Sequence, residues 1–183
     1  REINMKILVA FVLIIIGLTA LPESQIEGQV LAQISSEKSV KWDATQEYCL
    51  AQNIYFEAGN QSLEGMAAVA DVTLNRVQNP SYPNDICSVV KQGIKHPNGA
   101  MKRNMCQFSW YCDGQSDKVL TYTKAWENAQ YVAKVMLAEK DNYLGITSGS
   151  THYHATYVAP DWIYDRGMSR VTQIGSHIFY KFW

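Results

Sequence analysis

Three stretches of the chain repeat apolar residues every three or four positions, a spacing typical of helices with one buried face. The first covers residues 43–58, with Asp43 as a suitable N-cap, and the second covers 62–78, with Ser62 in that role. The third spans about 123–140. The inward faces that this spacing predicts are Leu50, Ala51, Ile54, Tyr55 and Ala58, then Met66, Val69, Ala70, Thr73, Leu74 and Val77, and finally Trp126, Ala129, Ala133, Met136 and Leu137.

The segments around these helices are more polar. Asn79-Pro80 ends the second helix, and Asn84 is placed as the cap of a short helix through Val90. Residues 92–105 contain Gly, Pro, His and Lys and predict an exposed loop. Asp71, in the middle of the second helix, is expected to face solvent.

The last forty residues change period. Residues 151–158 alternate and are rich in Thr and Tyr, and 171–174 and 177–182 form two more candidate strands around Gly175-Ser176, a turn compatible with a hairpin. The sequence therefore predicts an α+β domain with helices first and a small C-terminal antiparallel sheet.

The N-terminal region has the pattern of an export signal. Met5 is a plausible start, Lys6 supplies a positive charge, and an almost unbroken apolar run extends to Leu21. We expect residues 1–32 to be a signal peptide cleaved after Ala32, or a membrane anchor held through residues 5–21, followed by a linker over 33–45. Both readings place the remainder, 46–183, in the periplasm, the cell envelope or the extracellular space.

Four cysteines agree with an exported location: Cys49, Cys87, Cys106 and Cys112. An even number in an exported chain favours two disulfides, with three possible pairings. A structural zinc site is the alternative, but no pair has the close spacing of zinc ligands.

Charge and composition restrict the partner. The net charge is −1 and no basic face is evident, so we expect no nucleic-acid partner. Five tryptophans and eleven tyrosines suit a neutral glycan, because an aromatic ring can stack on the apolar face of a sugar.

Glu57 is the first candidate for chemistry. It lies about 90° from the centre of the first helix's apolar stripe, beside Phe56 and near the helix end. Apolar neighbours can raise the pKa of a carboxyl there enough for it to donate a proton to a glycosidic oxygen. A surface glutamate closing a helix is the alternative.

Short distinctive blocks follow one another along the chain from about Gln46 to Phe182. They are Asn53–Ser62, Gly65, Val69-Ala70, Leu74–Val77, Tyr82–Asn84, Cys87–Val90, Cys106–Gly114, Thr151–His154, Pro160–Trp162 and Ile174–His177. In their order and spacing these blocks resemble the cell wall hydrolase family, which includes the spore-cortex-lytic enzymes and their phage and Gram-negative relatives.

The resemblance implies a fold similar to lysozyme-like lytic transglycosylases. It also implies cleavage of peptidoglycan glycan strands between N-acetylmuramic acid and N-acetylglucosamine, with Glu57 as the catalytic residue. The family often has Glu-Ala-Arg-Gly where this chain reads Glu57-Ala58-Gly59-Asn60. The role of that arginine must therefore be absent or supplied elsewhere.

The resemblance suggests that Gln107, Ser109 and Trp110 contact the substrate. We also expect Tyr153 and His154, at the start of the sheet, to line the other wall of the site, and Tyr55 to contact the substrate. For Gln107–Trp110, a purely structural loop between Cys106 and Cys112 is the alternative. No cofactor or metal is expected, and we expect a monomer.

Three other functions remain open at this stage. A muramidase-type hydrolase would need a second carboxylate, for which the candidates are Glu64, Asp71, Asp85, Asp113 and Asp161. A metal-dependent peptidoglycan amidase would use His152 and His154 with Asp161, Asp165 or His177. A wall-binding module without activity is the third. The single distinctive acid favours a lytic transglycosylase, in which the sugar's own 6-hydroxyl attacks and one glutamate serves as acid and base.

Overall fold

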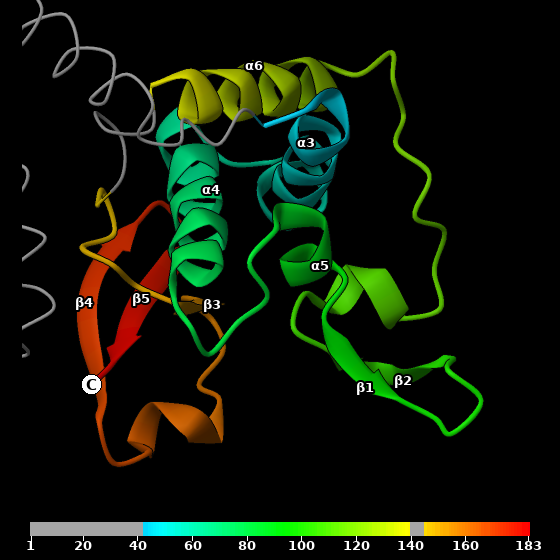
Figure 1. The fold of residues 1–183 in the computed structure, drawn as a ribbon. Helices are drawn as coiled ribbons and strands as arrows, with labels where there is room; N and C mark the ends of the chain where they lie inside the picture. The colour runs from blue at the N-terminus through cyan, green and yellow to red at the C-terminus, as the bar shows by residue number, and fades with distance from the viewer. Residues whose placement is uncertain (1–41, 140–144) are drawn as a thin grey trace, which may run out of the picture. The chain divides into compact units, whose positions relative to one another are not determined.

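The structure, a computed structural model, describes residues 42–139 and 145–183 (Figure 1). The leader and its cleavage site, most of the linker and the predicted end of the third helix at Lys140 lie outside these residues. The helices are α3 (Ala44–Ala58), α4 (Leu63–Gln78), α5 (Ile86–Val90) and α6 (Lys124–Ala138). The strands are β1 (Gly93–Lys95), β2 (Met101–Cys106), β3 (His152–Ala155), β4 (Met168–Ile174) and β5 (His177–Phe182), and two 3-10 turns cover Ser109–Cys112 and Asp161–Tyr164.

The caps predicted for the first two helices, Asp43 and Ser62, are confirmed, and the structure adds Thr123 as the cap of the third. The side chains of Asp43, Ser62 and Thr123 accept the backbone N–H groups of Gln46, Gly65 and Trp126 respectively. These bonds satisfy amide groups that a helix start leaves without an internal partner. The predicted stripes form the main hydrophobic core where α3, α4 and α6 pack together.

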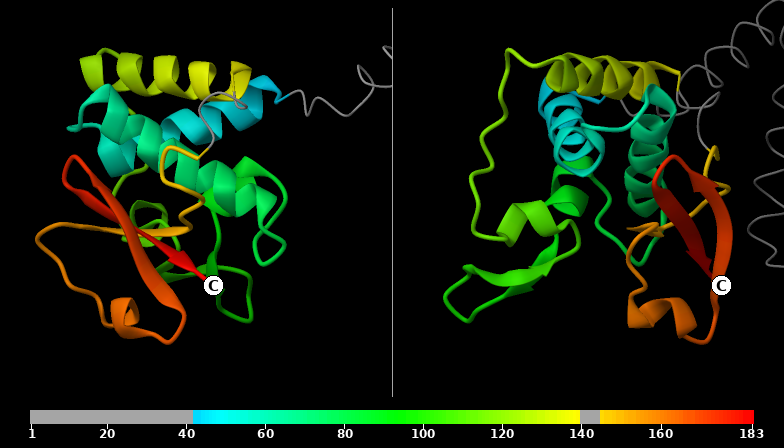
Figure 2. Two further views of the ribbon diagram at one scale, coloured as in Figure 1. Left: turned by 90° about the vertical axis from the view of Figure 1, so that its left-hand side faces the viewer. Right: turned by 180° about the vertical axis from the view of Figure 1, so that it is seen from behind.

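Helix α4 is buried on two sides, between the helical core and the C-terminal sheet (Figure 2). The prediction that Asp71 faces solvent is therefore wrong: its side chain is fully buried. Its carboxylate accepts the backbone N–H groups of Gly145 and Thr147, both at 2.9 Å, and the Thr147 hydroxyl. Asp71 thus holds the loop that leads into β3.

Two predictions for the middle of the chain need correction. The cap of α5 is Asp85 rather than Asn84, since Asp85 Oδ1 accepts the N–H of Ser88 at 2.8 Å. The segment expected to be a loop is an antiparallel hairpin of β1 and β2, with an irregular register between Gly93 and Lys95. Its strands are mostly exposed, so they lack the alternation of apolar residues by which strands are recognised.

The C-terminal sheet has the order β3-β5-β4 and is antiparallel throughout. The turn at Gly175-Ser176 is confirmed, with Gly175 at φ +56°. Strand β3 ends at Ala155 rather than Val158, and β4 begins three residues earlier than predicted. Phe179 of β5 packs with Ala68 and Val72 of α4, which fixes the sheet beside the helices.

All four cysteines are paired, as Cys49–Cys87 and Cys106–Cys112. The expectation of two disulfides is confirmed, and the pairing that the sequence left open is now assigned. The first joins α3 to α5, and the second closes the turn that follows β2.

The two disulfides should contribute unequally to stability. The first links residues 38 positions apart and the second residues six apart. Loop-closure entropy predicts a loss of about 4 kcal/mol in unfolding free energy for Cys49→Ala/Cys87→Ala and about 2 kcal/mol for Cys106→Ala/Cys112→Ala. Urea denaturation of both variants measures the difference. Equal losses, or four reactive thiols in the unfolded but unreduced protein, would contradict this expectation.

Among the described residues, none of the helices combines the length and the hydropathy needed to cross a lipid bilayer.

Candidate active site

A continuous groove runs between the helices and the C-terminal sheet. Its central cavity, of about 600 Å³, is lined by Phe56, Glu57, Arg76, Cys106, Gln107, Ser109, Trp110, Asp113, Tyr153, His154, Ala155, Tyr157, Val158, Pro160, Trp162 and His177. A second cavity of about 540 Å³ shares Glu57 and His177 with it, and a third of about 550 Å³ shares Arg76, Gln107 and Trp162. The groove therefore extends past Glu57 in both directions, as a site for a linear polymer requires.

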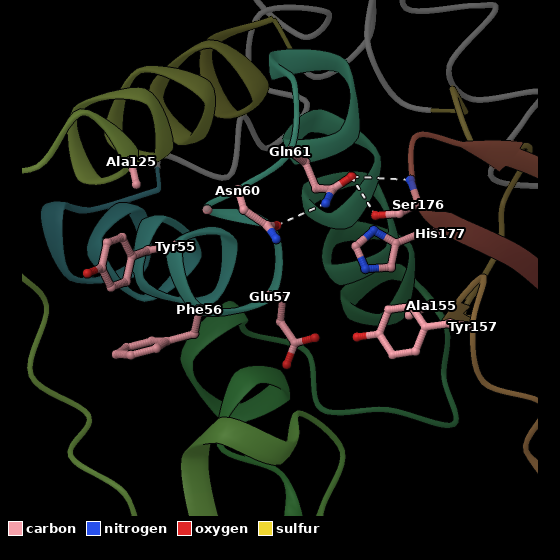
Figure 3. A pocket seen from close by; sticks show the side chains of 11 residues that line it. Tyr55, Phe56, Glu57, Asn60, Gln61, Ala125, Ala155, Tyr157, Ser176 and His177 are labelled. Atoms are coloured by element: carbon pink, nitrogen blue, oxygen red, sulfur yellow. Dashed lines mark hydrogen bonds between the residues drawn. The ribbon is translucent and has the colours of Figure 1, made fainter.

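Glu57 projects into this groove from the last turn of α3, with His177 and Tyr157 on the opposite side (Figure 3). Its Oε2 accepts a hydrogen bond of 2.8 Å from the Tyr153 hydroxyl. Burial raises the pKa of Glu57 above its usual value, while the Tyr153 bond and the positive charge of Arg76 act in the opposite direction. A carboxyl in this environment retains its proton to higher pH than an exposed one.

Tyr153 remains protonated and acts as the donor in this bond. Burial first, and then the charge of Glu57, raise the pKa of Tyr153 well above 10. The tyrosine comes from β3 and the glutamate from α3, so their bond joins the two walls of the groove.

The end of α3 is fixed by buried polar contacts. Trp110 Nε1 donates to Asn53 Oδ1 at 2.9 Å, and Asn53 Nδ2 donates to Thr73 Oγ1 at 3.1 Å. The Trp110 ring stacks on Phe56 with centroids 4.5 Å apart. These contacts hold the Ser109–Cys112 turn against the helix beside Glu57.

Arg76 of α4 joins three parts of the site. Its Nε donates to the backbone oxygen of Thr151 at 2.8 Å, at the start of β3. Its guanidinium lies over the Phe108 ring, 4.8 Å from the centroid, next to the turn that carries Ser109. Only 4% of the residue is exposed, and Nη1 is buried without a hydrogen-bond partner among the described residues. Burying a guanidinium is costly, and nearby Glu57 partly compensates for its charge.

Five of the six predicted substrate contacts line the central cavity with Glu57, namely Gln107, Ser109, Trp110, Tyr153 and His154. Tyr55 lines the adjoining cavity on the Gly59–Gln61 side of Glu57. Trp110 is only 7% exposed and its indole N–H is already bonded, so it can offer a ligand no more than part of its ring.

The candidate second carboxylates are widely dispersed. Asp71 is buried in the loop contact described above, Asp85 caps α5, and Glu64 and Asp161 are exposed. Asp113 alone among the five lines the central cavity with Glu57. Its Oδ1 accepts the backbone N–H of Gln115 at 2.7 Å.

His152 and His154 lie against the same ring, Trp162, with centroids 5.6 Å apart in both cases. Both nitrogens of His154 are within hydrogen-bonding distance of other groups, Nε2 of the Tyr180 hydroxyl and Nδ1 of the Ala155 carbonyl. Within residues 42–139 and 145–183, no three His, Cys, Asp or Glu side chains gather where they could hold a metal ion. The geometry needed for the amidase alternative is thus not found in this part of the chain.

The sequence did not mark Arg76, Tyr157, Trp162 or His177 as substrate-side residues of a glycan site. Arg76, Trp162 and His177 lie in blocks that carry the family resemblance, and those blocks are the sequence signal that could have identified them. Tyr157 is 88% exposed at the groove and lies in none of those blocks.

Comparison with known proteins supports the fold. The chain is similar to the spore cortex-lytic enzymes of Bacillus subtilis (strain 168), at 26% identity over 130 residues, and of Halalkalibacterium halodurans, at 28% over 131 residues. Each alignment covers 71% of this chain but only 35% and 33% of the relatives. The chain thus spans about a third of the length of these curated relatives.

Two solved structures resemble the described domain. The catalytic domain of the Bacillus cereus SleB protein matches with a TM-score of 0.53 and 26% identity, covering 77% of this chain and 94% of that domain. The catalytic domain of the germination-specific lytic transglycosylase SleB from Bacillus anthracis matches with a TM-score of 0.53 and 25% identity, covering 77% and 98%. The lysozyme-like α+β fold expected from the sequence is confirmed.

The family model described as Cell Wall Hydrolase matches residues 60–180, which begin three residues after Glu57 and include both Arg76 and Tyr153. The match covers about two thirds of the chain, including α4 and the C-terminal sheet but not α3. The chain therefore belongs to the cell wall hydrolase family.

Proposed function

We propose that this protein cleaves peptidoglycan glycan strands between N-acetylmuramic acid and N-acetylglucosamine as a lytic transglycosylase, with Glu57 as its acid and base. The observation that carries the proposal is the partly buried Glu57 carboxyl in the middle of an open-ended groove, bonded to Tyr153. The name of the Bacillus anthracis relative, a lytic transglycosylase, supports the reaction type.

The reaction requires two proton transfers at one carboxyl. Glu57 first gives its proton to the glycosidic oxygen, so that the bond from that oxygen to C1 of the muramic acid breaks. The resulting carboxylate then takes the proton of the muramic acid 6-hydroxyl, whose oxygen bonds to C1. The products are a strand with a free 4-hydroxyl and a strand with a 1,6-anhydro end, and no water is consumed.

Tyr153 and Arg76 support the second half of this cycle. After the first transfer Glu57 is negatively charged in a site that excludes much of the solvent, which is costly. The Tyr153 hydroxyl and the nearby guanidinium both favour the charged form. They therefore allow one partly buried carboxyl to release its proton and later regain it.

Hydrolysis is the second candidate, because Asp113 lines the same cavity. An inverting or retaining hydrolase needs a carboxylate on the other face of the sugar to activate water or attack C1. Asp113 is the one residue among those five candidates that could take this role without rearrangement of the fold.

Mass spectrometry of fragments released from purified peptidoglycan tests these alternatives directly. We expect 1,6-anhydro-muramic acid ends. Reducing muramic acid ends would favour hydrolysis with Asp113, and freed peptides would point to amidase activity. Intact glycan strands after prolonged incubation would reject the proposed function.

A further inference from the structure

The β1–β2 hairpin and its flanks carry only positive charge. Between Asp85 and Asp113 the chain has four Lys and Arg residues and no acidic residue. The other described residues include seven Lys and Arg and twelve Asp and Glu. The four are Lys91, Lys95, Lys102 and Arg103. The net charge of −1 thus conceals a locally basic segment.

Neighbouring carboxylates do not neutralise these charges. The single ion pair found in the described part of the chain joins Lys124 to Glu127 on α6. Arg103 Nε donates to the backbone oxygen of Asp113, at 2.9 Å, and not to its carboxylate. The hairpin therefore presents unpaired positive charges to solvent, where they can attract an anionic partner.

Two of the lysines line a separate cavity at the base of the hairpin. This cavity, of about 550 Å³, is bounded by Cys87, Ser88, Lys91, Gln92, Gly93, Lys95, Met101 and Tyr111. Ammonium, hydroxyl and amide groups provide hydrogen-bond donors, while Met101 and Tyr111 provide apolar surface. Because no acidic residue lines it, the cavity suits a carboxylate-bearing chain with some apolar content.

The walls of this cavity are held firmly. Both disulfides reach it, since Cys87 lines it and Cys106 packs against Gly93. The N–H of Gln107 donates to the oxygen of Gln92 at 2.9 Å and closes the hairpin base. Oε1 of Gln92 has no hydrogen-bond partner among the described residues, so the amide can turn toward a ligand without breaking a bond. A rigid site loses little conformational entropy on binding.

The cavity and the catalytic groove lie on two sides of one short turn. Trp110 lines the groove with Glu57, and its neighbour Tyr111 lines the hairpin cavity. Peptidoglycan carries short peptides with free carboxylates on its muramic acid residues. A strand in the groove would bring such a peptide close to the hairpin.

We propose that the basic hairpin, through Lys91 and Lys95, binds the acidic peptide branches of peptidoglycan and so selects strands that still carry them. This inference rests on the proposed function, because it assigns the peptides to the same polymer that occupies the groove. The attraction is electrostatic and should weaken as salt screens it.

Binding should be measured in the full chain carrying Glu57→Gln, so that the polymer is not cut during the experiment. The test variant adds Lys91→Gln/Lys95→Gln, and the matched control adds Lys118→Gln/Lys134→Gln, which removes two exposed charges elsewhere. Sedimentation with purified peptidoglycan, and with the same glycan stripped of peptides by an amidase, gives the affinities at low and high salt.

We expect the test variant to bind intact peptidoglycan roughly fivefold more weakly at low salt than the control variant. The two variants should bind stripped glycan equally, and high salt should abolish their difference. An equal loss of affinity for stripped glycan in the test variant would overturn the inference. A loss of affinity seen only with phosphate-rich wall polymers or anionic lipid vesicles would overturn it as well. When Glu57 is left intact, the variant Lys91→Gln/Lys95→Gln should cleave stripped glycan as fast as the wild type does. If the wild type cleaves neither intact peptidoglycan nor stripped glycan, the proposed function fails, but the binding comparison remains valid.

Discussion

Replacement of Glu57 by glutamine should reduce peptidoglycan cleavage by at least about a thousandfold, within the range that general acid catalysis contributes. The amide preserves the size of the side chain and can still accept the Tyr153 hydrogen bond, but it has no proton to transfer at the glycosidic oxygen. The rate of anhydro-end formation from purified peptidoglycan is the measurement.

The fold should survive this change. Burial raises the pKa of Glu57 in the folded protein, so the unfolded chain ionises it more readily. At neutral pH this difference slightly favours unfolding, and it disappears below the unfolded pKa of about 4.5. The melting temperature of Glu57→Gln at pH 7 should therefore equal or exceed that of the wild type.

The matched control is Glu64→Gln, which changes an exposed glutamate in the first turn of α4 and should retain full activity. Near-normal cleavage by Glu57→Gln would reject the assignment of the acid.

Removal of the charge of Arg76 should move the pH profile as well as slow the reaction. The guanidinium favours the ionised form of Glu57, so Arg76→Gln should raise the pKa of Glu57 further. Because Glu57 must be protonated to act as the acid, activity is lost as pH rises through its pKa. The alkaline limb of kcat/KM should therefore shift upward by roughly one pH unit, while the maximum falls about tenfold or more.

Arg76→Lys separates charge from geometry. Lysine keeps the positive charge but loses the Nε bond to Thr151 and the planar contact with Phe108. It should leave the alkaline limb near its original pH even if the protein is less stable. The other groups facing Glu57, namely Tyr153, His177, His154, Tyr157 and Asp113, are unchanged in both variants. If the alkaline limb of kcat/KM stays at the same pH in Arg76→Gln, Arg76 has a structural role alone.

The helices were predictable because local signals agree. Asp43, Ser62 and Thr123 each stand directly before an apolar stripe, and each caps the helix that follows. The position of Glu57 at the edge of the apolar stripe also follows from helix geometry, whereas its proposed role as the acid rests on the family resemblance.

Other features depend on residues far away in the chain. Asp71 contacts a loop more than seventy positions later, and nothing in the local pattern of α4 reveals that partner. Arg76 contacts Thr151, directly before β3, and Phe108, directly before the Ser109–Cys112 turn, and both are distant from it in the chain. The β1–β2 hairpin is exposed and polar, so its backbone pairing leaves no trace in the apolar pattern. Periodicity detects burial against a neighbour but does not identify the neighbour.

The two-sided burial of α4 also affects how the protein unfolds. One face of this helix belongs to the helical core, and Ala68 and Val72 on another face hold Phe179 of the sheet. Loss of either contact surface would expose apolar area on the same helix, so the two surfaces should open in one cooperative event. Glu57 and Tyr153, which belong to the two sides, would then be separated only when the whole domain unfolds. Heat inactivation and loss of tertiary structure should accordingly follow a single transition, without a folded intermediate that retains half of the groove.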